Sequence, residues 1–318
     1  MSRIWPLLLG MATGLGFRLA FRGDAEQALN VMMASFMLLV PVAVGVVTVY
    51  AAERSRRRSW GYYFLSAAGA NLLFVAGTFA ILIEGLICAI VAAPLFALIG
   101  GLAGLATGAF FRWRGRAGPG SLSIVVLPFL FGSVEQHLPL RDRIDTVTAA
   151  RVVAASPEQV WQVITRAEGI RPEEMEDAWM YRIGVPLPLS AITEEHSGER
   201  VRHIEMGKGI AFDQVIVDWE PARRVRYRYR FTPESFPAGA LDEHVLIGGT
   251  YFDLLDTEYA LEPAGNGTRL TASMSYRVST HFNWYSRFIA RFLIGNFEAT
   301  ALEFYAYRAE RIRADGSR

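Results

Sequence analysis

The strongest constraint in this chain is a change of composition near residues 133–140. Before it, long apolar segments follow one another with short polar connections. After it, polar and apolar residues alternate, and an aromatic-rich segment closes the chain. A bilayer is crossed by about 20 consecutive apolar residues, whereas alternation with a period of two is typical of half-buried strands. We therefore predict a membrane domain over residues 1–135, followed by a separate domain in water.

Four segments are apolar and long enough to cross a bilayer, namely residues 4–21, 28–50, 60–82 and 85–111. Arginine clusters within 54–58 and 112–116 follow the second and the fourth of them, and such clusters favour the cytoplasmic side. A fifth segment, 121–132, is short for a span: if it crosses, the next domain is extracytoplasmic, and otherwise that domain is cytoplasmic. We predict a multi-pass protein of a bacterial cell (inner) membrane with four or five transmembrane helices.

Small and charged residues within these segments suggest how they pack. Gly100, Gly101, Gly104 and Gly108 recur in the fourth segment at a spacing that lets helix backbones approach closely. Glu84 lies where the third and fourth segments meet. An acidic residue near membrane depth is a functional candidate, but we favour an ordinary interfacial turn for Glu84, because it falls where two segments meet.

Composition excludes several classes of site. Cys88 is the only cysteine, so the chain has neither an intramolecular disulfide nor a cysteine-based metal cluster. The formal net charge is +1, which gives no basic bias toward nucleic acid. The sequence contains neither a phosphate-binding glycine loop nor close histidine and carboxylate spacing for a metal. We therefore predict no metal, no cofactor and no nucleic-acid partner.

Alternation in the second half is clearest at residues 224–231, where valine and aromatic residues alternate with four arginines. One face of this strand is apolar and the other is cationic. The cationic face either is solvated and paired with acids of the adjacent strand, or rests on anionic headgroups. A second alternating run, 269–278, follows the turn Gly265-Asn266-Gly267, whose Asn-Gly pair suits a tight hairpin.

Two helices frame these strands. Ser156 and Pro157 are typical of a helix start, with a serine cap and a proline in the first turn. Residues 281–313 form a long helical pattern rich in aromatic residues. The order predicts an α+β domain in which a curved antiparallel sheet wraps on a long C-terminal helix.

Three segments carry a resemblance to a known family. Residues 153–161 (VAASPEQVW), 217–221 (VDWEP) and 267–271 (GTRLT) resemble segments of the START-like, or SRPBCC, superfamily. That superfamily includes polyketide cyclases, aromatic-ring hydroxylase domains and birch-pollen-allergen-like proteins. The resemblance implies a helix-grip fold over residues 145–313, with a deep cavity between sheet and helix that holds hydrophobic ligands. It does not transmit a reaction, because many functions share this fold.

Candidate site residues follow from alternation together with this resemblance. The predicted cavity lining is aromatic and apolar: Tyr227, Tyr229, Tyr259, Met274, Tyr276, Phe288 and Phe292. The same residues could also form an ordinary core. Three residues are candidate polar groups in the cavity: His203, Asp213 and Glu258. None of them belongs to a recognisable catalytic motif, so the catalytic residues stay unknown.

Three function hypotheses remain at this point. The first is membrane-anchored binding of a hydrophobic small molecule or lipid, with the bilayer and that ligand as partners. The second is a cyclase-like or hydrolytic enzyme that uses His203, Asp213 or Glu258 as acid or base. The third is a membrane sensor or structural protein in which the helices are the active part.

Overall fold

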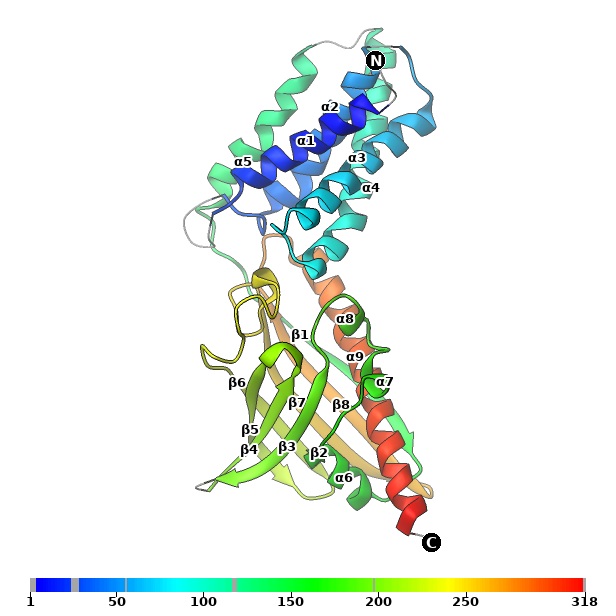
Figure 1. The fold of residues 1–318 in the computed structure, drawn as a ribbon, viewed down its shortest axis with the longest axis vertical. Helices are drawn as coiled ribbons and strands as arrows, with labels where there is room; N and C mark the ends of the chain where they lie inside the picture. Colours follow the sequence, from blue (N-terminus) through cyan, green and yellow to red (C-terminus); the bar gives the residue numbers. More distant parts are fainter. Residues whose placement is uncertain (1–3, 24–28, 55, 116–118, 197, 317–318) are drawn as a thin grey trace. The chain divides into compact units, whose positions relative to one another are not determined.

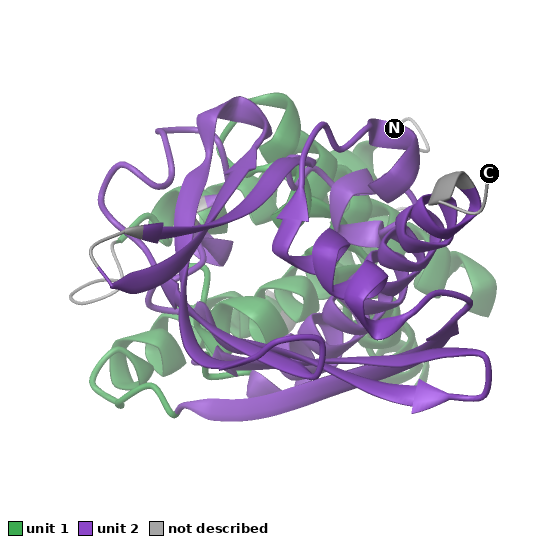
Figure 2. Ribbon diagram, turned by 90° about the horizontal axis from the view of Figure 1, so that it is seen from below, with its two compact units in different colours: residues 1–141, 280–282 green, residues 142–279, 283–318 purple. Residues whose placement is uncertain are grey.

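The computed structural model describes residues 4–23, 29–54, 56–115, 119–196 and 198–316, and the chain divides into two compact units. The first comprises Met1–Arg141 with Thr280–Phe282, and the second comprises Asp142–Ser279 with Asn283–Arg318 (Figure 2).

The first unit is helical (Figure 1). Its elements are α1 (Trp5–Ala20), a π-helical turn (Ser35–Leu39) that leads into α2 (Val40–Glu53), α3 (Trp60–Ala80), α4 (Leu86–Arg114), a 3-10 helix (Pro119–Val126) and α5 (Leu127–Glu135). Helix α4 packs on α2 and α3, and α1 packs on the same two helices. A Cβ atom added to Gly104 would lie 2.5 Å from the carbonyl oxygen of Tyr63, so this glycine is required for the close approach of α3 and α4.

Among the described residues of this unit, three helices are long and apolar enough to cross a membrane: Ser35–Glu53, Trp60–Ala80 and Leu86–Arg114. They correspond to three of the four predicted spans. Helix α1 has 16 residues and is therefore about 24 Å long, less than the roughly 30 Å of a hydrocarbon core. Segment 121–132 folds into the 3-10 helix and α5, and its apolar helical stretch Leu122–Glu135 is shorter than the three long helices.

Glu84 lies in the turn between α3 and α4, where its carboxylate pairs with the guanidinium of Arg18 from α1. Both side chains are about nine-tenths buried. The pairing leaves neither charge uncompensated, which agrees with the interpretation of Glu84 as part of an interfacial turn.

The second unit is built on one eight-stranded sheet in the order β1-β8-β7-β6-β5-β4-β3-β2 (Figure 1). The strands are β1 (Arg143–Val153), β2 (Arg166–Ala167), β3 (Pro188–His196), β4 (Glu199–Met206), β5 (Ala211–Glu220), β6 (Arg224–Arg230), β7 (Phe252–Ala264) and β8 (Gly267–Val278). All neighbouring pairs are antiparallel. From β2 to β8 the strands follow chain order, and β1 pairs with β8.

Four helices accompany the sheet: α6 (Pro157–Thr165), α7 (Pro172–Met175), α8 (Trp179–Arg182) and α9 (Asn283–Gly316). Ser156 caps α6 through a capping box with Gln159, as the serine and proline predict. Helix α9 packs on β1 and β8. A curved antiparallel sheet with a long C-terminal helix is a helix-grip arrangement, so this part of the predicted fold is confirmed.

The β7–β8 hairpin is tight, but its turn differs by one residue from the predicted Asn-Gly pair. Ala264 pairs with Gly267, so the two turn residues are Gly265 and Asn266, and Gly265 has φ +60°. Gly267 belongs to the strand. A Cβ atom there would collide with the carbonyl oxygen of Val153. The two backbones approach so closely that only glycine fits at this position.

The cationic face of β6 is paired with acids from neighbouring strands. Arg224 lies 2.8 Å from Asp218, Arg226 lies 3.1 Å from Asp256, and Arg230 lies 3.0 Å from Asp213. These side chains are roughly one-fifth to one-half exposed. Of the two alternatives for the cationic face, the structure therefore contains the one in which the arginines are solvated and paired with acids of adjacent strands.

Candidate functional site

Polar side chains gather on the inner face of the sheet, where they meet α9. Alternation along β4, β5 and β6 turns Arg202, Gln214 and Tyr227 inward, and all three are buried. Tyr259 from β7 and Tyr305 from α9 are buried beside them, with their rings 5.4 Å apart. We call these five residues, together with Tyr229, the interior polar cluster.

Arg202 lies at the centre of this cluster. It is a charged residue, yet it is only 3% exposed. Its Nη2 donates to the hydroxyl of Tyr305 at 2.9 Å, and its Nη1 donates to Oε1 of Gln214 at 3.3 Å. Its guanidinium carbon lies 5.1 Å from the ring centre of Tyr227. Among the described residues, no carboxylate lies within ion-pairing distance of Arg202, and its Nε has no acceptor.

The tyrosines supply neutral hydroxyl groups to the same region. Burial raises the pKa of Tyr227 to about 12 and that of Tyr229 to about 12, so both hydroxyls keep their protons at pH 7. The Tyr229 hydroxyl lies 2.7 Å from Oγ1 of Thr257. The hydroxyl of Thr193 lies near that of Tyr227 and slightly lowers the pKa of Tyr227. Among the described residues, neither hydroxyl has a well-directed hydrogen bond.

Glu298 on α9 is a second buried polar group, with only 2% of the residue exposed. Burial raises its pKa to about 8, although the backbone amide of Met274 acts in the opposite direction. Neither carboxyl oxygen makes a well-directed hydrogen bond within the residues that the structure describes. Glu298 and Tyr305 are seven residues apart, so they share one face of α9 at about 10 Å along its axis.

Five of the predicted lining residues lie inside the second unit. Tyr227, Tyr259, Met274 and Tyr276 are buried, and Tyr229 is partly buried beside them. Tyr276 sits next to β1, and its hydroxyl donates to Asp145 at 3.4 Å.

The two predicted lining residues from α9 lie elsewhere. Phe288 is 67% exposed and Phe292 is 51% exposed. The buried positions on this stretch of α9 include Ala290 and Ile294, and a residue two positions away points to nearly the opposite side of a helix. Phe288 and Phe292 therefore do not line the interior.

The three predicted polar groups lie on the outer face of the sheet. Nδ1 of His203 is 2.7 Å from Oδ1 of Asp213, and this pair is half to one-third exposed. Glu258 stands next to the inward Tyr259 on β7. Because the neighbours of these residues point inward, alternation turns His203, Asp213 and Glu258 outward, so they do not reach the interior polar cluster.

Sequence reasoning missed Arg202 and Glu298, although both left a signal. Arg202 is in phase with Ile204 and Met206 on β4, so a charged residue occupies the apolar phase of a strand. Glu298 lies four residues from Ile294 and four from Leu302, within an apolar stripe of α9. A charged residue at a position where the period of the strand or helix calls for an apolar one is the signal that identifies both.

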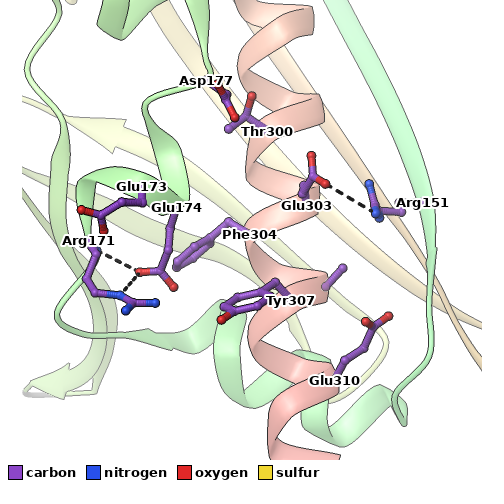
Figure 3. Close-up of a pocket in the computed structure, with 11 residues that line it drawn as sticks. Arg151, Arg171, Glu173, Glu174, Asp177, Thr300, Glu303, Phe304, Tyr307 and Glu310 are labelled. Carbon is purple, nitrogen blue, oxygen red and sulfur yellow. Dashed lines mark hydrogen bonds and ion pairs between the residues drawn. The ribbon is translucent and has the colours of Figure 1, made fainter.

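A separate groove of about 430 Å³ lies between α7, β1 and another face of α9 (Figure 3). It is strongly acidic, and three of its five carboxylates, those of Glu174, Asp177 and Glu303, are paired with arginines. Arg308 contacts Glu174 at 2.7 Å and lowers the pKa of that carboxyl to about 2, and Arg151 lies 3.8 Å from Glu303. We favour the interior polar cluster as the functional site, because its charge is both buried and without a described carboxylate partner.

The comparison with protein families agrees with this fold. The chain belongs to the family described as polyketide cyclase / dehydrase and lipid transport, whose model matches residues 145–307. The helices of the first unit lie outside that match. No curated protein matches the chain.

Similar solved structures include an aromatase/cyclase, Zhui, from a Streptomyces species, at 17% identity and a TM-score of 0.32. That alignment covers 53% of this chain and 95% of the other. A second is a point mutant of norcoclaurine synthase from Thalictrum flavum in complex with a transition-state analogue, at 9% identity and a TM-score of 0.34. It covers 54% of this chain and 98% of the other.

Proposed function

We propose that the second unit binds a hydrophobic small molecule or lipid between the inner face of its sheet and α9, with an oxygen group of the ligand on Arg202. The family description, which includes lipid transport, supports the hydrophobic part of this ligand. The single observation that carries the proposal is the buried guanidinium of Arg202, which no described carboxylate neutralises.

The physical argument concerns the cost of that charge. A buried ion is expensive unless it is paired and fully hydrogen-bonded. Arg202 has two neutral acceptors, Tyr305 and Gln214, and its Nε has none. A ligand carboxylate, phosphate or enolate oxygen would supply the missing acceptor through a charge-assisted hydrogen bond. The tyrosine rings around it would contact the apolar remainder of the ligand.

The helices of the first unit would have a supporting role. Three of them are long and apolar enough to cross a membrane, and in this proposal they anchor the domain at the bacterial inner membrane. Anchoring would keep the binding site near a store of lipids and apolar metabolites, so that the ligand comes from the adjacent bilayer.

A second candidate function is acid–base catalysis on the same ligand, and Glu298 favours it. A carboxyl group with a pKa of about 8 is partly protonated near neutral pH and can donate or accept a proton. This candidate replaces His203, Asp213 and Glu258 by Glu298 as the acid or base, because only Glu298 lies inside.

The test is native mass spectrometry of the full chain, purified from its host membrane in mild detergent, with lipid extraction. We expect an apolar ligand that carries an acidic or phosphate oxygen, at defined stoichiometry. Arg202→Gln should lose most of this ligand, whereas Arg226→Gln, a matched change on the outer face, should keep it. Equal retention by both variants would contradict the proposal.

A further inference from the structure

The exposed side of the first turns of α9 is unusually aromatic. Trp284, Phe288 and Phe292 follow one another at intervals of four residues, and their exposed fractions are 59%, 67% and 51%. Residues at this spacing lie on one face of a helix. They form a continuous exposed stripe over more than two helical turns.

A fourth aromatic residue, from α8, extends this stripe. The backbone amide of Trp179 donates to Oδ1 of Asn296 at 2.6 Å, which fixes the start of α8 beside α9. The Trp179 ring lies 6.4 Å from the ring of Phe292 and is 47% exposed. We call Trp179, Trp284, Phe288 and Phe292 the aromatic face.

On α9, the charged residues beside the aromatic face are positive. Residues 283–297 contain two arginines and no acidic residue. Arg287 and Arg291 share one carboxylate, that of Asp145, at 2.8 and 3.5 Å. Further along α9, exposed charges of both signs occur, Glu303 and Glu310 together with Arg311 and Arg313. The segment that is aromatic and lacks acidic residues is thus confined to the start of this helix.

This combination matches the interfacial layer of a membrane. Tryptophan is enriched at the headgroup level, and arginine can extend along an apolar surface to reach anionic headgroups. The position in the chain agrees: residues 280–282 belong to the unit that contains the three apolar helices, and α9 starts at residue 283. The aromatic face therefore begins within two residues of that unit.

We propose that the aromatic face inserts into the interfacial layer of a bilayer that contains anionic lipid. Burial of exposed rings in the acyl boundary is favourable in proportion to their apolar area. Arg287 and Arg291 would then face the headgroups. The aromatic face is exposed whereas the interior polar cluster is buried, so the proposal does not depend on a ligand in that cluster.

The test uses the full chain, reconstituted in phosphatidylcholine vesicles with and without phosphatidylglycerol. Cys88→Ala provides a cysteine-free background, and nitroxide labels are placed through Phe288→Cys, Phe292→Cys and, as the matched control on the same helix, Tyr307→Cys. Power saturation then compares collisions with oxygen, which concentrates in lipid, and with a water-soluble nickel chelate.

We expect the ratio of oxygen to nickel collisions at 288 and 292 to be several-fold higher than at 307, and the difference to grow with phosphatidylglycerol. Equal ratios at the three positions would overturn the proposal. Protection from both reagents, or dipolar broadening between labels at 288, would overturn it in favour of a protein partner or a second copy.

Discussion

Arg202 and Tyr305 are joined by a 2.9 Å hydrogen bond that links β4, an inner strand of the sheet, to the long helix α9. The bond involves a buried charge, yet its acceptor is a neutral hydroxyl. A charge that only stabilised the fold would be expected to face a carboxylate, as Arg308 does with Glu174. The relationship between Arg202 and Tyr305 leaves room for a third group, which in our proposal is the ligand.

Replacement of Arg202 by methionine should separate stability from binding. Arg202→Met removes an uncompensated buried charge, so we expect the free energy of unfolding to change by no more than about 1 kcal/mol, while the co-purified ligand is lost. Thermal unfolding in detergent and lipid extraction measure the two effects. Arg308→Met is the control: it breaks the pair with Glu174 and should cost about 2 kcal/mol without loss of ligand. The reverse pattern would identify Arg202 as a structural residue.

Tyr305→Phe tests the hydrogen bond itself. The substitution keeps the ring and removes only the acceptor of Arg202, so we expect a loss of about 1 kcal/mol in the free energy of unfolding and a lower ligand occupancy. Tyr307→Phe, two residues further along α9 and exposed, is the matched control. Identical ligand occupancy in both variants would show that the Tyr305 hydroxyl does not position Arg202.

Glu298 should make stability depend on pH. Burial raises its pKa from 4.5 to about 8, so the folded protein holds a proton that the unfolded chain releases. The stability contributed by this proton is complete below pH 4.5 and decreases as the pH rises to about 8, by at most about 1.4 kcal/mol per pH unit. Glu298→Gln should remove this decrease in a series of unfolding curves between pH 5 and pH 8, and an unchanged slope would contradict the assignment.

His203 should be dispensable. Its imidazole is half exposed and pairs with Asp213 on the outer face, where such pairs contribute about 1 kcal/mol or less. We expect His203→Ala to keep both the ligand and any turnover of that ligand. A loss of turnover with an intact fold would restore the outer-face pair as a catalytic candidate.

The elements that could be predicted from the sequence are those with a strong local period. Alternation over 224–231 correctly indicates a strand, and it identifies Tyr227 and Tyr229 as the opposite face to the arginines, because strand periodicity depends only on neighbouring residues. The Ser156 cap and the long C-terminal helix are local in the same sense. The hairpin turn is displaced by one residue because the close approach of Val153 to Gly267 involves a strand more than 100 residues away.

The candidate site was harder to predict because it depends on which face of each element turns inward. On α9, aromatic residues occur both inside and outside, so composition does not reveal that Phe288 and Phe292 are exposed while Tyr305 is buried. On β4, both phases contain charged residues, and the usual expectation that arginine points to water conceals Arg202. Only the packing of α9 on the sheet distinguishes the two faces.

The most direct test of the central claim is photo-crosslinking in the native membrane. The benzophenone amino acid p-benzoylphenylalanine is placed at position 229, whose side chain points inward on β6, and separately at position 228, which points outward on the same strand. After irradiation, intact-mass measurement of the purified full chain should show an adduct of defined mass at 229 and none at 228. The absence of an adduct at 229, or the same adduct at both positions, would contradict a ligand between the sheet and α9.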